Sequence, residues 1–93
     1  MKNPEKRAKS IQFILEKHLS PDILKIKDQS SLHKGHNNIP EGFTETHFSI
    51  YVVSKKFVGM SNVQRHRLVN NLLLDEFSSG LHALELKLKT TED

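Results

Sequence analysis

Three short segments in which apolar and polar residues alternate constrain the fold of this 93-residue chain most. They cover residues 23–28, 46–54 and 81–89, and they predict strands because successive side chains of a strand point to opposite faces. One stretch with a helical pattern separates the second strand from the third. A strand, a helical crossover and another strand favour right-handed parallel pairing, whereas the first two strands can pair antiparallel. The sequence therefore predicts a small mixed three-stranded sheet.

Two amphipathic segments predict the helices. Apolar residues recur every three or four positions between residues 8 and 19, so we expect a helix from about residue 4 to residue 18, which Ser20 and Pro21 end. Ser61 and Gln64 form a capping-box pattern that begins a second helical region, and residues 78–80 end it. Helices packed on one face of the sheet give an α+β fold. The buried stripe expected in the second region is Val69, Leu72, Leu73 and Phe77, with Leu68 beside it.

The second and third predicted strands each carry a histidine. His47 lies on the face opposite Phe48 and Ile50, which favours a structural or exposed role. His82 shares its parity with the leucines at positions 84, 86 and 88. Two interpretations of His82 follow, a metal ligand or a partly buried histidine that hydrogen-bonds to a backbone carbonyl.

The composition excludes several kinds of chemistry. The chain has no cysteine, so it has no disulfide, no thiolate nucleophile and no cysteine-held metal site of its own. Any metal must be held by carboxylates or by some of the six histidines. No nucleophile, base and orienting residue occur at a recognisable spacing, so we do not expect an enzyme.

Length and hydropathy bound the organisation of the chain. Residues 1–93 are expected to form a single domain, monomeric when alone. No stretch approaches the roughly 18 apolar residues that a membrane span needs, and Glu16, Lys17 and His18 interrupt any signal-peptide pattern. We therefore expect a cytoplasmic protein, with the mitochondrial matrix as the alternative.

A basic cluster, Arg65, His66 and Arg67, lies at the start of the second helical region, where cations oppose the positive end of the helix dipole. Such placement indicates either packing within the fold or binding of an anionic partner. Arg65 and Arg67 are also the residues of an alternative function, DNA binding through a helix-turn-helix-like segment. A net charge of +3 supports only modest, salt-sensitive binding, and the sequence has no GXXG loop.

Residues 29–45 form a polar segment that predicts a long loop, and loops of this length in small domains are more often functional than idle. The chain from this loop onward resembles the BolA family over more than half its length. Within the loop, Gly35-His36 resembles the form of the family that carries a histidine, not a cysteine. The other matching pieces are Thr46-His47-Phe48, Val53-Ser54, Phe57 with Gly59, Arg65-His66-Arg67, Glu76 and Gly80-Leu81-His82-Ala83-Leu84.

The resemblance implies an αββααβ architecture similar to a class II KH fold, and an adaptor function. BolA-like proteins associate with monothiol glutaredoxins, and a 2Fe-2S cluster bridges the two partners. The glutaredoxin contributes a cysteine and glutathione; by resemblance, His82 and the loop residue His36 are the ligands of this chain, with His33 competing for the loop position. Such complexes are linked to cluster trafficking and to iron or redox sensing.

The chemistry of this sequence is compatible with that role. Imidazole is a good iron ligand, and histidine in place of thiolate raises the potential of a 2Fe-2S centre and makes the ligand titratable. Since the chain has no cysteine, a cluster needs a partner's thiolate, and none is expected in the isolated chain.

Overall fold

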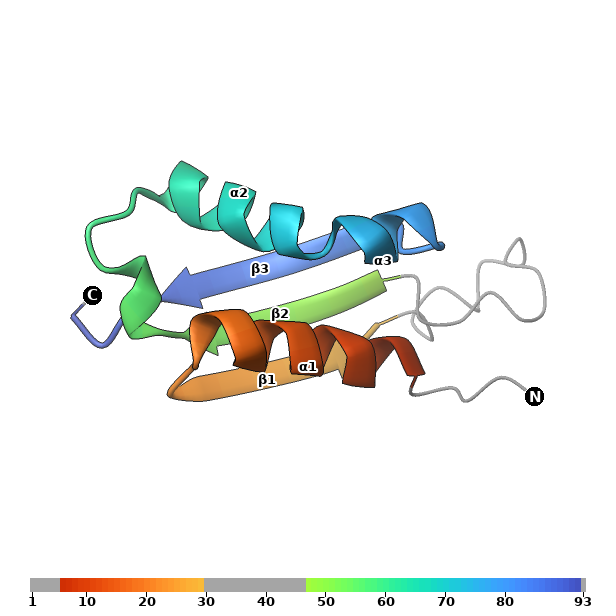
Figure 1. Ribbon diagram of the computed structural model, residues 1–93, viewed down its shortest axis with the longest axis horizontal. Coiled ribbons are helices and arrows are strands. Elements are labelled where there is room, and N and C mark those ends of the chain that lie inside the picture. Colours follow the sequence, from red (N-terminus) through yellow and green to blue (C-terminus); the bar gives the residue numbers. More distant parts are fainter. Residues whose placement is uncertain (1–5, 30–46, 93) are drawn as a thin grey trace.

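The computed structural model describes residues 6–29 and 47–92, and it has the expected order of elements (Figure 1). The strands begin and end within one or two residues of the predicted bounds. The elements are α1 (Lys6–Leu19), β1 (Ile23–Asp28), β2 (His47–Val53), the short 3-10 helix η2 (Lys55–Phe57), α2 (Asn62–Leu72), α3 (Leu74–Ser78) and β3 (Ala83–Lys89).

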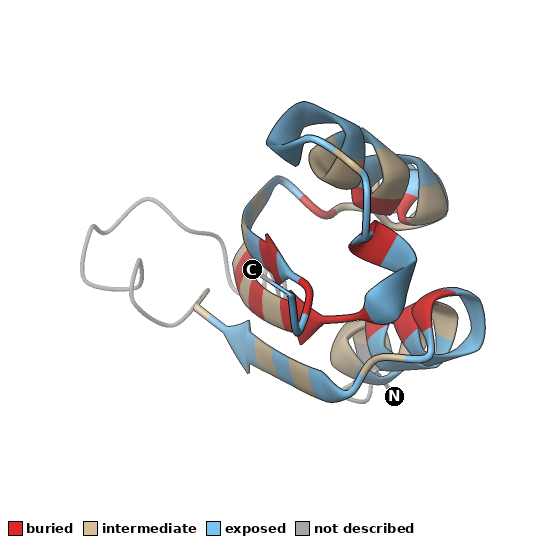
Figure 2. Ribbon diagram, turned by 90° about the vertical axis from the view of Figure 1, so that its left-hand side faces the viewer, coloured by how far each residue is buried: buried red, intermediate tan, exposed pale blue. Residues whose placement is uncertain are grey.

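The three strands form one sheet in the order β1-β2-β3. β1 pairs antiparallel with β2, and β2 pairs parallel with β3, so Ile26, Ile50 and Leu86 lie side by side across the sheet. The predicted mixed sheet is confirmed. The helices lie together on one face of it, as the end-on view in Figure 2 shows. No helix among the described residues covers the other face, which we call the uncovered face.

The core lies between the helices and the covered face of the sheet. The predicted faces of β2 are confirmed, because Phe48, Ile50 and Val52 are at most 1% exposed. On the uncovered face His47, Ser49 and Tyr51 are only half-buried. The helical layer closes the core with Ile11, Leu15, Leu19, Phe57, Val69 and Leu73, each at most 1% exposed.

The end of α1 is held to the end of β2 by Ser54. Ser20 adopts a positive φ of 43° just after the helix, its N–H donates to the Glu16 carbonyl at 3.2 Å, and Pro21 follows. The buried Ser54 hydroxyl donates to the Leu19 carbonyl at 2.6 Å and accepts from the Lys56 N–H at 3.1 Å. Ser54 thus satisfies one of the carbonyls that the end of a helix leaves unpaired.

The second helical region is two helices, not one continuous helix, although the residues of the predicted stripe do belong to the core or pack against it. The predicted capping box of Ser61 and Gln64 begins α2. At Leu73 the backbone departs from helical dihedrals, with φ −104° and ψ 16°, and α3 begins at the next residue. Leu73 is fully buried at this break. The break agrees with the two helices that the αββααβ architecture implies.

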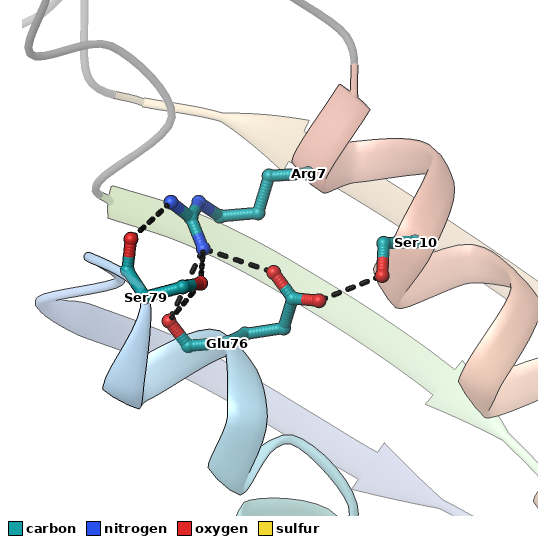
Figure 3. Close-up of polar contacts among 4 residues, drawn as sticks. All are labelled: Arg7, Ser10, Glu76 and Ser79. Carbon is teal, nitrogen blue, oxygen red and sulfur yellow. Dashed lines mark hydrogen bonds and ion pairs between the residues drawn. The ribbon is translucent and has the colours of Figure 1, made fainter.

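A buried ion pair joins α1 to α3 (Figure 3). Arg7 Nη1 donates to Glu76 Oε1 at 2.9 Å, with side chains only 11% and 13% exposed. The same Nη1 lies 2.8 Å from the Ser79 hydroxyl, and Nη2 donates to the Ser79 carbonyl at 3.1 Å. Ser10 Oγ donates to the other Glu76 oxygen, Oε2, at 2.6 Å. This network connects residues that are 69 positions apart in the sequence.

Candidate functional site

Two histidines, His47 and His82, meet at one end of the sheet. Because β2 and β3 are parallel, both strands begin at this end, and His47 pairs in register with Ala83. His82 directly precedes that residue. The two imidazole ring centroids lie 6.1 Å apart with the ring planes at 89°. His82 is exposed and His47 is half-buried, so this end of the sheet presents an imidazole pair to its surroundings.

His82 differs in one respect from the prediction. The strand was expected to start at residue 81, but β3 starts at Ala83, and His82 lies outside it. Gly80 has a φ of 128° and Leu81 is buried at 2% exposure, so the chain is anchored on the residue before the histidine. The interpretation of His82 as a partly buried histidine is therefore wrong, because its side chain is exposed.

His47 is the residue whose position the sequence analysis did not connect with a site. Its pattern favoured a structural or exposed role, and the structure brings it beside His82. The predicted parallel pairing could have placed His47 at the site, because it sets the start of β2 beside the start of β3. The loop residues His33 and His36 lie outside the described residues.

The histidine pair supplies too few ligands for a metal centre by itself. Among residues 6–29 and 47–92, no group of three or more His, Cys, Asp or Glu side chains gathers where it could hold a metal ion. A 2Fe-2S cluster takes four ligands, and up to two of them can be imidazoles. The two imidazoles of the described site are therefore too few to hold such a cluster without further ligands.

The basic cluster lies at the other end of β3. The contacts of Arg65 support the interpretation that it packs within the fold. Its Nε donates to the Met60 carbonyl and its Nη1 donates to the Leu88 carbonyl, both at 3.0 Å. Its guanidinium lies 5.8 Å from the centroid of the Phe57 ring. His66 is half-buried and Arg67 is exposed. The structure thus separates the basic cluster from His82.

A groove runs between the start of α2 and the end of β3. Its volume is about 520 Å³. A second depression on α2 contains both His66 and Arg67. The groove is lined by Met60, Asn62, Arg65, His66 and the four residues 86–89.

In the part of the chain that the structure describes, no helix is both long and apolar enough to cross a membrane.

Residues 15–93 match the family described as BolA-like protein. The chain belongs to the BolA family. It is 46% identical over 91 residues to the Arabidopsis thaliana "Protein BOLA1, chloroplastic", covering 96% of this chain and 56% of that protein. It is 42% identical over 87 residues to the Vibrio cholerae "DNA-binding transcriptional regulator BolA", covering 89% of this chain and 77% of that one. The chain thus spans little more than half of its plant relative.

A solved BolA structure supports the fold assignment. The BolA domain of SufE1 from Arabidopsis thaliana superposes with a TM-score of 0.81 at 45% identity, covering 92% of this chain and 93% of that domain. The predicted α+β class is therefore confirmed as a BolA fold. The likeness to class II KH domains stays a prediction.

Proposed function

We propose that this BolA-family chain is an adaptor that binds a monothiol glutaredoxin, with glutathione, and shares a bridging 2Fe-2S cluster with it. The observation that carries the proposal is the exposed His82 beside His47, in a chain without cysteine. An exposed imidazole can reach an iron held by a partner. A chain without thiolates depends on that partner to complete the cluster.

His82 is the first proposed ligand, because it is exposed and lies just outside the regular strand. The second is a loop histidine, His36, with His33 as its competitor. His47 is a further candidate, since it lies beside His82.

Adding the chain to a cluster-loaded monothiol glutaredoxin should change the visible absorption and circular dichroism of the cluster. We expect His82→Ala to abolish most of that change, because it removes the exposed ligand. His36→Ala and His47→Ala are measured in the same titration. The variant that gives the same spectrum as His82→Ala identifies the second ligand.

His18→Ala is the matched control, because His18 is an exposed histidine on α1. It should leave the spectrum of the mixed complex unchanged. Association is measured separately by analytical ultracentrifugation. If wild type binds glutaredoxin without altering the cluster spectrum, the chain works by contact alone and histidine ligation is excluded. If the two proteins do not associate, the adaptor proposal fails.

DNA binding is the second candidate, and the name of the Vibrio cholerae relative is the observation that favours it. Because Arg65 is engaged within the fold, the exposed Arg67 is the cleaner residue to test. If duplex DNA binds here, Arg67→Ala should weaken binding and lower the slope of log affinity against log salt by about 1. Fluorescence anisotropy with a labelled duplex at several salt concentrations measures this.

Lys17→Ala, an exposed cation on α1, is the control for DNA binding. An equal effect of Arg67→Ala and Lys17→Ala would indicate attraction by net charge, and the α2 site would be rejected.

The compartment stays a proposal. We propose the cytoplasm, or the mitochondrial matrix in a eukaryotic cell. The relatives that support this range are a bacterial BolA and an Arabidopsis thaliana protein named "SufE-like protein 1, chloroplastic/mitochondrial".

A further inference from the structure

The outer edge of β3 carries backbone groups that its pairing with β2 does not use. Ser54 N–H donates to the Lys89 carbonyl at 2.9 Å, so the backbone groups of Lys89 face β2. Successive residues of a strand direct their N–H and C=O groups to opposite edges. The backbone groups of Leu84, Leu86 and Leu88 therefore face outward. The Leu88 carbonyl confirms this direction, because it accepts from Arg65 on the outer side.

The groove between α2 and β3 lies along this edge. Residues 86–89 form one wall of it, and Met60, Asn62, Arg65 and His66 form the other. Met60, Leu86 and Leu88 give it apolar surface beside the outward-facing peptide groups. Arg65, fixed by its bonds to Met60 and Leu88, marks one end of the edge that an added strand could use.

The charge of the groove selects the kind of segment that fits it. Arg65, Lys87 and Lys89 are the charged residues that line the groove, and none of the described residues that line it is a carboxylate. Glu85, which is earlier on β3, is not among the lining residues. The groove beside the other edge strand, β1, is about 260 Å³, and it contains Glu16 as well as Lys9. Of the two described edges of the sheet, that of β3 therefore combines strand-pairing groups with a groove whose charged lining residues are all cations.

We propose that the outer edge of β3 binds an extended, acidic segment of a partner protein, which adds to the sheet as a fourth strand. Strand addition uses main-chain hydrogen bonds for affinity and side-chain contacts for specificity. A second copy of this chain is the competing occupant, because antiparallel pairing of two β3 edges can place Glu85 of one copy opposite Lys87 of the other. A concentration-dependent dimer of the isolated chain in analytical ultracentrifugation would assign the edge to self-pairing and overturn the proposal. A phosphodiester backbone accepts hydrogen bonds but does not donate them, so it cannot pair with the outward carbonyls of Leu84 and Leu86.

This surface is distinct from the histidine pair. His82 precedes β3 and Lys89 ends it, so the two lie roughly 20 Å apart at about 3.3 Å per residue. The proposal does not depend on cluster binding, because it rests on the backbone groups of β3 and on the groove beside them, not on the histidines.

The test uses a fluorescein-labelled nine-residue peptide in which Glu alternates with Val. We expect it to bind the full chain and to slow hydrogen exchange at the amides of Leu84, Leu86 and Leu88. The double variant Lys87→Glu, Lys89→Glu should weaken binding about tenfold or more, because it reverses two contacting charges. The matched control is Lys25→Glu, Lys27→Glu, which makes the same change of net charge on two exposed lysines of β1.

The proposal is overturned if both double variants lose affinity equally, since that indicates attraction by net charge alone. It also fails if a peptide of alternating Glu and Pro, which matches the charge but cannot pair as a strand, binds equally well. Protection of the same amides by a twelve-nucleotide oligothymidine, without protection by the Glu-Val peptide, would assign the groove to nucleic acid instead. Circular dichroism of each variant verifies that it is folded.

Discussion

Phe57→Ala should lower the free energy of unfolding by about 3–5 kcal/mol, the usual range for removing a buried aromatic ring. Phe57 is fully buried at the end of η2 and belongs to the core that joins the helices to the sheet. Arg65 also packs over its ring. Domains of this size have a total stability of roughly 5–15 kcal/mol, so we expect the midpoint of urea unfolding, followed by far-UV circular dichroism, to fall sharply.

Phe13→Ala is the control for this substitution, because Phe13 lies on α1 with 67% of its surface exposed. The same atoms are removed in both variants, and only the burial differs. Phe13→Ala should change the stability by about 0.5 kcal/mol or less. Similar midpoints for the two variants would contradict the burial of Phe57.

Glu76→Ala should destabilise the fold by about 3 kcal/mol, because it leaves the Arg7 guanidinium in a largely buried position without its carboxylate. It also removes the acceptor of the Ser10 hydroxyl. Glu16→Ala is the control on an exposed carboxylate, which only accepts a hydrogen bond from Gln12 at 3.2 Å. That variant should shift the unfolding midpoint little.

A double-mutant cycle separates the ion pair from other effects of the substitution. The double variant Arg7→Met, Glu76→Leu should be less destabilised than the sum of its two single variants, because neither charge is then left buried alone. Additive losses in urea unfolding would show that Arg7 and Glu76 stabilise the fold independently of each other.

The sequence predicted those parts of the fold that depend on residues close together in the sequence. Alternation within each strand defined its faces, and the single crossover defined the parallel pairing. The ion pair of Arg7 with Glu76 was not predictable in this way, since only the packing of α1 on α3 brings the two residues together. The spacing of apolar residues also did not predict the break at Leu73. A buried leucine fits the apolar spacing of a helix whether or not the backbone stays helical at that residue.

The candidate site was predicted in part. The family resemblance selected His82, and the exposure of this residue in the structure is consistent with a ligand. The neighbouring His47 was assigned a structural or exposed role, because alternation describes which face a residue occupies, not which residue of another strand lies next to it. Arg65 and Arg67 could not be told apart from the sequence. The structure distinguishes them, because Arg65 donates hydrogen bonds to the carbonyls of Met60 and Leu88.

The central position of β2 also bears on the dynamics of the histidine pair. β2 is paired on both edges, whereas β3 is paired on one, so local opening of β3 breaks one ladder of hydrogen bonds and opening of β2 breaks two. His47 therefore sits on the most persistent strand, and His82 sits just before an edge strand that can fray. We therefore expect amide hydrogen exchange to be slower at His47 than at His82.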